Sequence, residues 1–191
     1  MRLQLALMGI VGLMLAGGAG AWQLSRIGVH QGYSPAQPIA FPHKVHAGDN
    51  KIACLYCHSA ARTSRHAGIP AASICMNCHS IMEKQTVEIE KLKEAVQTQR
   101  PIQWVKVHNL PDFVYFNHSQ HVVSGVACQR CHGPVETMER VKQASPLTMG
   151  WCLECHREHA KIETGDFQRA ALSLKEKQKP VAGLDCASCH Y

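Results

Sequence analysis

Ten cysteines and five histidines fall in one repeated pattern, in which two cysteines are separated by two residues and followed directly by a histidine. The pattern leaves no cysteine over, and its five copies are Cys54-Cys57-His58, Cys75-Cys78-His79, Cys128-Cys131-His132, Cys152-Cys155-His156 and Cys186-Cys189-His190. In such a run the two thiols form thioethers with a c-type haem and the histidine is the proximal iron ligand. A zinc site would need a second Cys or His pair arranged for tetrahedral closure, and a disulfide scaffold would not need the histidine. The sequence therefore predicts five haem c groups.

The sixth coordination position of each iron decides between electron transfer and substrate binding. Eight histidines lie outside the motifs, and four of them belong to an internal repeat, FPHKVH at 41–46 and FNHSQH at 116–121. Each copy precedes two haem motifs, so we expect two related dihaem units with a fifth motif appended. The repeat histidines, His43, His46, His118 and His121, are the predicted distal ligands.

The fifth distal ligand stays open between three histidines and one methionine, namely His66, His108, His159 and Met149. Methionine as an axial ligand generally raises the reduction potential relative to two histidines. If Met149 were the ligand, one haem would have a higher potential than the other four.

The first residues form an apolar run, Leu3 to Leu24, that is interrupted only by Gln4 and Gln23. Its 22 residues are enough to cross the hydrocarbon core of a bilayer, although a cleaved signal peptide explains the same pattern. The length favours an anchor. Since haem attachment of this type implies the outer side, we expect a single-pass protein of the cytoplasmic membrane with its haem domain on the periplasmic face.

We therefore expect three parts: a transmembrane anchor at 1–26, a linker rich in glycine and proline at 27–40, and a pentahaem domain at 41–191. Within the domain, the repeat units are 41–80 and 116–160, and the fifth motif lies at 186–190. The predicted fold class is a class III-like multihaem cytochrome c, mostly irregular with short α-helices around a haem core. Aromatic residues make up only 6% of the chain, so the cofactors must supply much of the buried apolar mass.

Two charged stretches lie outside the motifs. Residues 81–99 place apolar side chains roughly on one face, which predicts a solvated amphipathic helix that ends before Pro101, and 173–179 predicts a second short helix. Residues 101–117 read as extended. The formal charge of +6 does not indicate nucleic-acid binding, because five haems with two propionates each would add on the order of −5.

Three long stretches carry a resemblance to a known family. They are FPHKVHAGDNKIACLYCHSAARTSRHAGIPAASICMNCH (41–79), WVKVHNLPDFVYFNHSQHVVSGVACQRCHGPVE (104–136) and SPLTMGWCLECHRE (145–158). They resemble the pentahaem cytochrome c subunit of alternative complex III, a bacterial quinol-oxidising membrane assembly. The paired FxHxxH segments are also shared with class III multihaem cytochromes generally.

The resemblance implies an electron-relay subunit that is not an enzyme by itself. Its implied partners are a polytopic quinone-binding membrane subunit, an iron–sulfur, molybdopterin-oxidoreductase-like subunit, and a monohaem cytochrome c, copper protein or terminal oxidase as acceptor. Related assemblies use similar cytochromes for electron flow towards quinone. Two other functions remain as alternatives: an anchored quinol dehydrogenase that serves a separate periplasmic reductase, and a catalytic multihaem reductase.

Overall fold

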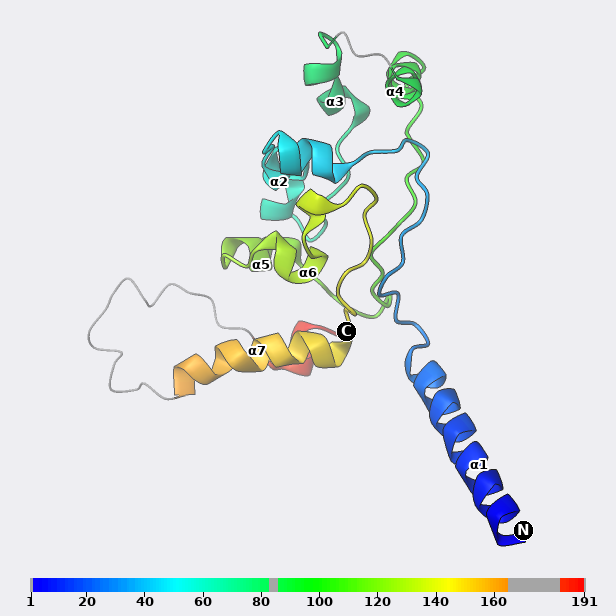
Figure 1. The fold of residues 1–191 in the computed structure, drawn as a ribbon. Helices are drawn as coiled ribbons and strands as arrows, with labels where there is room; N and C mark the ends of the chain where they lie inside the picture. Colours follow the sequence, from blue (N-terminus) through cyan, green and yellow to red (C-terminus); the bar gives the residue numbers. More distant parts are fainter. Residues whose placement is uncertain (1, 83–85, 165–182, 191) are drawn as a thin grey trace.

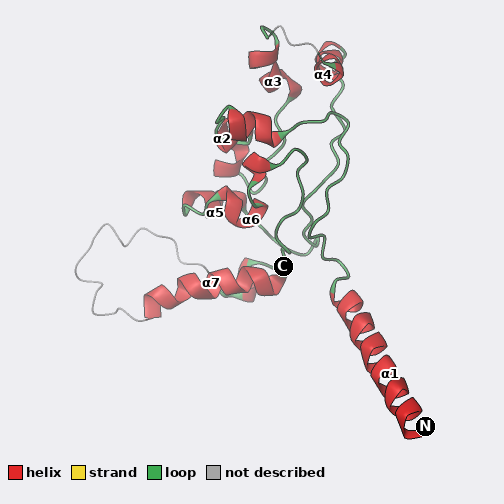
Figure 2. Ribbon diagram, viewed as in Figure 1, coloured by secondary structure: helices red, strands yellow, loops and turns green. Residues whose placement is uncertain are grey.

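The computed structural model describes the chain except for residues 1, 83–85, 165–182 and 191 (Figure 1). Short helices separated by irregular segments make up the described residues, and they include no β-strand, only an isolated bridge between Val114 and His190 (Figure 2). The predicted fold class is confirmed in these terms. The helices are α1 (Arg2–Ser25), η1 (Lys44–Asp49), α2 (Cys54–Cys57), η2 (Ser59–Arg62), α3 (Ala72–His79), α4 (Val87–Gln97), α5 (His118–Val123), α6 (Cys128–His132), η3 (Val135–Thr137), α7 (Met149–Thr164) and η5 (Cys186–Ser188).

Helix α1 projects from the rest of the molecule as a single rod (Figure 1). Its segment Gln4–Ser25 has a mean hydropathy of 1.8 and none of it is buried against the rest of the chain. At 1.5 Å per residue, its 24 residues span about 36 Å, which is long enough to cross a bilayer. These properties fit an anchor, and they fit a signal sequence equally.

The linker after α1 is bound to the body of the protein. The Gly32 N–H donates to the carbonyl of Gln143 at 2.7 Å, and the Gln143 N–H donates to the carbonyl of Tyr33 at 3.0 Å. The Ser34 hydroxyl adds a bond to the carbonyl of Val141 at 3.1 Å. These contacts hold the root of α1 beside the segment that leads into α7.

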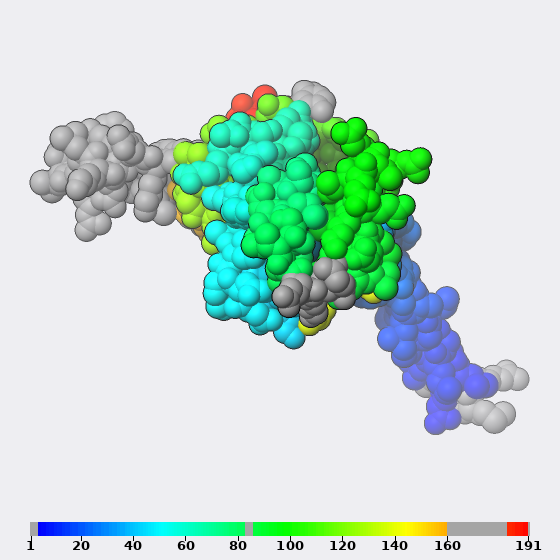
Figure 3. Space-filling view, turned by 90° about the horizontal axis from the view of Figure 1, so that it is seen from above, coloured from blue at the N-terminus to red at the C-terminus, as the bar shows by residue number. Residues whose placement is uncertain are grey.

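Helices α3, α2, α6 and α7 follow one another along one side of the molecule, with α5 beside α6 (Figure 1). Three irregular segments, near 30–41, 100–112 and 138–148, run along the other side (Figure 2). In the space-filling view from above, the segments of α2, α3 and α4 lie side by side (Figure 3). The order of the helices in space therefore differs from their order in the chain, because α2 and not α3 lies next to α6.

Helix α4 is shorter than the predicted helix at 81–99 and is not fully solvated. It begins at Val87 because the Thr86 side chain caps it by accepting the Ile89 N–H at 3.3 Å. Its charged residues also hold the linker: Glu88 accepts the Ala40 N–H at 2.7 Å, and the Lys91 ammonium donates to the carbonyl of Pro38. Two hydrogen bonds to the Glu88 carboxylate hold its pKa below the usual value. The bond from Lys91 has the larger effect and the bond from the Ala40 N–H the smaller one. The predicted short helix at 173–179 lies outside the described residues.

The protein's own core is small. Among the described residues, the buried hydrophobic side chains are Ile39, Ala61, Leu92 and Met138. The most deeply buried polar side chain is Gln143, whose carbonyl oxygen accepts the Asn109 N–H at 3.0 Å and whose amide donates to the carbonyl of Ser145 at 3.2 Å. So small a core fits the expectation that cofactors supply most of the buried apolar mass.

Candidate haem-binding sites

Each Cys-x-x-Cys-His run lies on a helical turn. We number the five as sites 1 to 5 in chain order: site 1 is on α2, site 2 on α3, site 3 on α6, site 4 on α7 and site 5 on η5. Residues three and four apart on a helix share one face, so a helical turn directs both thiols and the histidine to the same side. All ten cysteines have free thiols in the structure. This geometry suits two thioether bonds and one iron ligand to the same macrocycle.

Each of the four repeat histidines faces the histidine of a different motif. The ring centres are 6.5 Å apart for His43 and His58 and 6.1 Å apart for His46 and His79. In the second unit they are 6.3 Å apart for His118 and His132, and 6.1 Å apart for His121 and His156. The first histidine of each repeat thus faces the first motif of its unit, and the second histidine faces the second motif.

These separations fit one iron between each pair of rings. A metal–nitrogen bond to imidazole is about 2.0 Å long, and a ring nitrogen lies about 1.1 Å from the ring centre for bonds of about 1.33 Å. Two imidazoles on one iron therefore have their centres about 6.2 Å apart. The four observed distances lie within about 0.3 Å of this value.

In five of these eight rings, Nδ1 is directed to a backbone carbonyl. The Nδ1–H groups of His46, His118 and His121 donate to the carbonyls of Pro42, Arg65 and Asn117, and those of His58 and His156 donate to Gly68 and Gly183, all at 2.7–3.0 Å. Because Nδ1 carries the proton, the lone pair is on Nε2, where it can bind iron. The Nδ1 atoms of His43 and His79 are buried without a hydrogen-bond partner among the described residues.

The phenylalanine of each repeat positions both of its histidines. The Phe41 ring lies edge-on to His43 at 4.9 Å and stacks on His46 at 4.1 Å. The Phe116 ring repeats this arrangement with His118 at 4.8 Å and His121 at 4.7 Å. Packing against one rigid ring fixes the rotamers of two ligands at once, which explains the residue spacing of FxHxxH.

Burial keeps several of these histidines neutral. It lowers the pKa of His43 to about 4, with further lowering from His58 and His46. It also lowers the pKa of His132 to about 4, with further lowering chiefly from His108 and His118. The pKa of His79 is lowered by burial and by His46. An uncharged ring at neutral pH is the form that can bind a metal.

Burial also acts on the thiols. It raises the pKa values of Cys57, Cys75, Cys128, Cys131 and Cys152, with smaller contributions from neighbouring thiols. These groups are therefore protonated at neutral pH. A protonated thiol exchanges slowly with disulfides, so the pairs stay available for thioether formation.

Site 5 is built differently from the other four. It is hydrogen-bonded to the extended segment 113–115. The Tyr115 N–H donates to the carbonyl of Cys189 at 2.7 Å, and the Nδ1–H of His190 donates to the carbonyl of Phe113 at 3.3 Å. The ring that faces His190 is that of Phe113, at 5.7 Å. Within the described part of the chain, no second histidine forms such a pair with His190.

The four candidates for the fifth distal ligand are in different environments. His108 lies against His132, with 3.1 Å between His108 Nε2 and His132 Nδ1. His159 donates its Nδ1–H to the carbonyl of Cys155 one turn earlier on α7. Met149, which is 64% exposed, and His66 are both open to solvent. In the part of the chain that the structure describes, no ring contact joins His190 to His66, His108 or His159.

The role of His108 was not foreseen from the sequence. If Nε2 of His132 binds iron, its Nδ1 carries the proton and donates to His108 Nε2. His108 would then take the place that a backbone carbonyl has at sites 1 and 4. Nothing in the spacing of the sequence distinguishes such a hydrogen-bond acceptor from an iron ligand.

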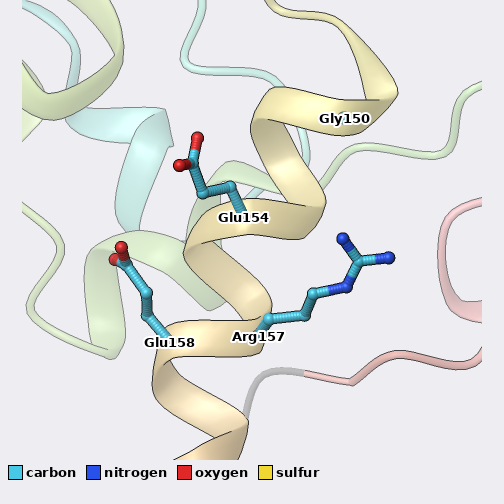
Figure 4. A pocket seen from close by; sticks show the side chains of 4 residues that line it. All are labelled: Gly150, Glu154, Arg157 and Glu158. Carbon is cyan, nitrogen blue, oxygen red and sulfur yellow. The ribbon is translucent and has the colours of Figure 1, made fainter.

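A polar hollow of about 440 Å³ lies on α7, beside site 4 (Figure 4). It is lined by Gly150, Glu154, Arg157 and Glu158, and in Figure 4 the two glutamates point away from Arg157. Glu158 also forms an ion pair with Arg130 at 3.8 Å. A lining of three charged side chains does not suit a macrocycle, so we assign no haem to this hollow.

Two comparisons with known proteins agree with this geometry. The family model for cytochrome c3 matches residues 120–191. The multihaem cytochrome c subunit of the menaquinone reductase of Nitratidesulfovibrio vulgaris is 33% identical over 186 residues, which cover 94% of this chain and 78% of that protein. The identity extends over nearly the whole length of this chain, and the helical turns of the chain carry Cys-x-x-Cys-His runs whose histidines face the repeat histidines. The chain therefore belongs to the family of multihaem cytochrome c subunits.

Proposed function

We propose that this chain is the electron-relay subunit of a membrane complex that reacts with quinone, and that it carries five haem c groups. The observation that carries the proposal is the set of four facing histidine pairs, one for each of sites 1 to 4, at the separation that a single iron requires. An iron with two protein ligands has no position for a substrate. Such a site therefore serves electron transfer and not catalysis.

The chain's residues have separate tasks in this relay. The ten motif cysteines hold the macrocycles through thioethers, and the five motif histidines are the proximal ligands. The repeat histidines are the distal ligands of sites 1 to 4, and backbone carbonyls orient most of these rings. When bound, each haem supplies a one-electron couple at its iron.

The anchor and the resemblance to alternative complex III define the proposed surroundings. Helix α1 lies in the cytoplasmic membrane, and the haem domain, residues 41–191, lies on the periplasmic face. A polytopic subunit oxidises quinol to quinone and releases two protons and two electrons, and an iron–sulfur, molybdopterin-oxidoreductase-like subunit completes the assembly. The electrons leave, one at a time, to a monohaem cytochrome c or another periplasmic acceptor.

The second candidate is the opposite direction of electron flow. It is favoured by the name of the relative from Nitratidesulfovibrio vulgaris, which is a menaquinone reductase subunit. A relay of bis-histidine haems can conduct in either direction, so the reactions of the partners decide between the two. Mixing the purified native assembly with menaquinol and an oxidised periplasmic acceptor, and separately with a reduced periplasmic donor and menaquinone, shows which reaction turns over.

The haem proposal is tested on the full-length protein by intact mass and magnetic spectra. We expect five haem adducts, and low-spin ferric signals from sites 1 to 4. The substitution His43→Ala should convert one haem to a high-spin form that binds CO, because it removes the ligand that faces His58 at 6.5 Å. His30→Ala is the matched control and should leave the spectra unchanged. Fewer than five adducts, or no new high-spin haem in His43→Ala, would contradict the proposal.

A further inference from the structure

The order of the five sites in space can be read from contacts between their motifs. The residue before the second cysteine makes such a contact in three of the motifs, those of sites 1, 2 and 3. At site 2 this residue is Asn77, whose amide donates to the hydroxyl of Tyr56, the corresponding residue of site 1, at 3.1 Å. At site 3 it is Arg130, which forms an ion pair with Glu158, two residues after His156 of site 4, at 3.8 Å. Sites 1 and 2 are therefore neighbours, and so are sites 3 and 4.

The two dihaem units meet through their first sites. Cys54 of site 1 and Cys128 of site 3 are close enough to interact electrostatically, which contributes to the raised pKa of Cys128, and His58 and His43 likewise act on the pKa of His132. The segment that follows site 1 also binds α5: the carbonyls of Ser64 and Arg65 accept the N–H groups of Ser119 and His118, both at 3.2 Å. Since His118 is the histidine that faces His132, site 3 is built partly on the chain that leaves site 1.

Site 5 adjoins site 4. The Nδ1–H of His156 donates to the carbonyl of Gly183, three residues before Cys186, at 2.8 Å. Cys152 of site 4 and Cys189 of site 5 are also close enough to interact electrostatically. Within the described residues, no hydrogen bond or ion pair joins the motif of site 2 to the motifs of sites 3, 4 or 5.

We infer that the chain arranges its haem attachment sites in the linear order 2, 1, 3, 4, 5, so that site 1, and not site 2, connects the first dihaem unit to the second. The inference deepens the proposed function, because an order of sites matters only if the sites hold haems. The arrangement of α3, α2, α6 and α7 along one side of the molecule agrees with it (Figure 1).

The order places one end of the row of sites near the anchor helix and the other end far from it. The linker after α1 is held to 141–145, which lies a few residues before α7 and site 4. Helix α3 with site 2 lies at the opposite end of the molecule (Figure 1). Sites 4 and 5 are therefore placed to exchange electrons with a donor or acceptor at the membrane, and site 2 with one beyond it.

A matched pair of variants separates this order from the order of the sequence. In the full-length protein, Cys54→Ala with Cys57→Ala removes the haem of site 1, and Cys75→Ala with Cys78→Ala removes that of site 2. Neighbouring haems shift one another's potentials through their charges. Removal of the site 1 haem should therefore shift two of the remaining potentials, and removal of the site 2 haem only one, in redox titrations followed by EPR. The reverse result, with two shifts for site 2 and one for site 1, would overturn the inference.

A second measurement does not depend on how the variants fold. Cryo-electron microscopy of the native assembly gives the iron positions, and the shortest iron–iron distances should join sites 2 and 1, 1 and 3, 3 and 4, and 4 and 5. An iron of site 2 that lies between those of sites 1 and 3 would refute the order and leave the proposed function intact. Fewer than five haem adducts in the intact mass would instead refute the proposed function.

Discussion

Removal of the His108 side chain should raise the reduction potential of the haem at site 3. His108 Nε2 lies 3.1 Å from Nδ1 of His132, the proximal ligand of that site. An acceptor at this position makes the imidazole a stronger electron donor to its metal. A stronger donor stabilises ferric iron more than ferrous iron, so the hydrogen bond lowers the potential and its loss raises it.

The size of the shift follows from the strength of one hydrogen bond. A bond to a charged partner is worth about 1 kcal/mol more than one to a neutral partner, and the ferric centre carries one more positive charge than the ferrous one. For a one-electron couple, about 1.4 kcal/mol corresponds to about 59 mV. His108→Ala should therefore raise one of the five potentials by about 40 mV.

The assay is a spectroelectrochemical titration of the full-length protein, with EPR to identify the haem that changes. His108→Gln is the conservative control, because its side-chain oxygen can accept the same proton and should restore most of the original potential. His30→Ala, outside all candidate ligands, should leave all potentials unchanged. The reasoning is refuted if His108→Ala lowers a potential or shifts none. It is also refuted if the variant creates a high-spin haem, since that outcome would make His108 an iron ligand.

Three further outcomes are expected. Ferric EPR spectra should show two classes of low-spin haem, because the facing rings are nearly parallel at sites 1 and 3 (6° and 11°) and crossed at sites 2 and 4 (56° and 48°); a single class would contradict the ring geometry. Gly133→Ala should destabilise the holoprotein by about 1–3 kcal/mol in urea titrations, because Gly133 has a φ of +71° and an added Cβ would meet Ala144 at 2.6 Å. Gly125→Ala, at a φ of +79° with open space around it, should cost less, and equal costs would refute the steric argument. Gln143→Leu should cost about 1–3 kcal/mol because it removes the buried oxygen that accepts the Asn109 N–H, whereas Gln31→Leu on the surface should cost little; equal melting temperatures for the two would contradict this.

The sequence was sufficient for the parts of the sites that depend on local spacing. The five motifs and the two FxHxxH segments each lie on one or two helical turns, so their geometry follows from residue positions a few apart in the chain. The structure places each distal ligand predicted from the repeat opposite a motif histidine, as in the pair of His43 with His58. The fold class was predictable for the same reason, since short helices around repeated motifs need no long-range information.

Long-range contacts could not be predicted in this way. The hydrogen bond between His108 and His132 joins residues 24 positions apart, and it competes with a ligand role that uses the same residue type. The order of the sites depends on the hydrogen bonds of Ser64 and Arg65 with α5 and of Asn77 with Tyr56, which no periodicity encodes. The start of α4 was predicted six residues too early because the Thr86 cap is a weaker signal than the apolar and charged pattern that begins at Ile81.

The repeat and the inferred order together explain why the chain needs so little protein core. Each FxHxxH segment places one histidine at each site of its unit, and the two units meet where site 1 adjoins site 3. Every haem of the two units would therefore be ligated by histidines of its own unit and flanked by another site, and site 3 is also held by the chain that leaves site 1. Because the described residues bury only four hydrophobic side chains of their own, contacts between haem and chain must supply most of the free energy of folding. The arrangement that brings the sites into a line for electron transfer is then the same arrangement that forms the core, and a change that displaces one haem should weaken both.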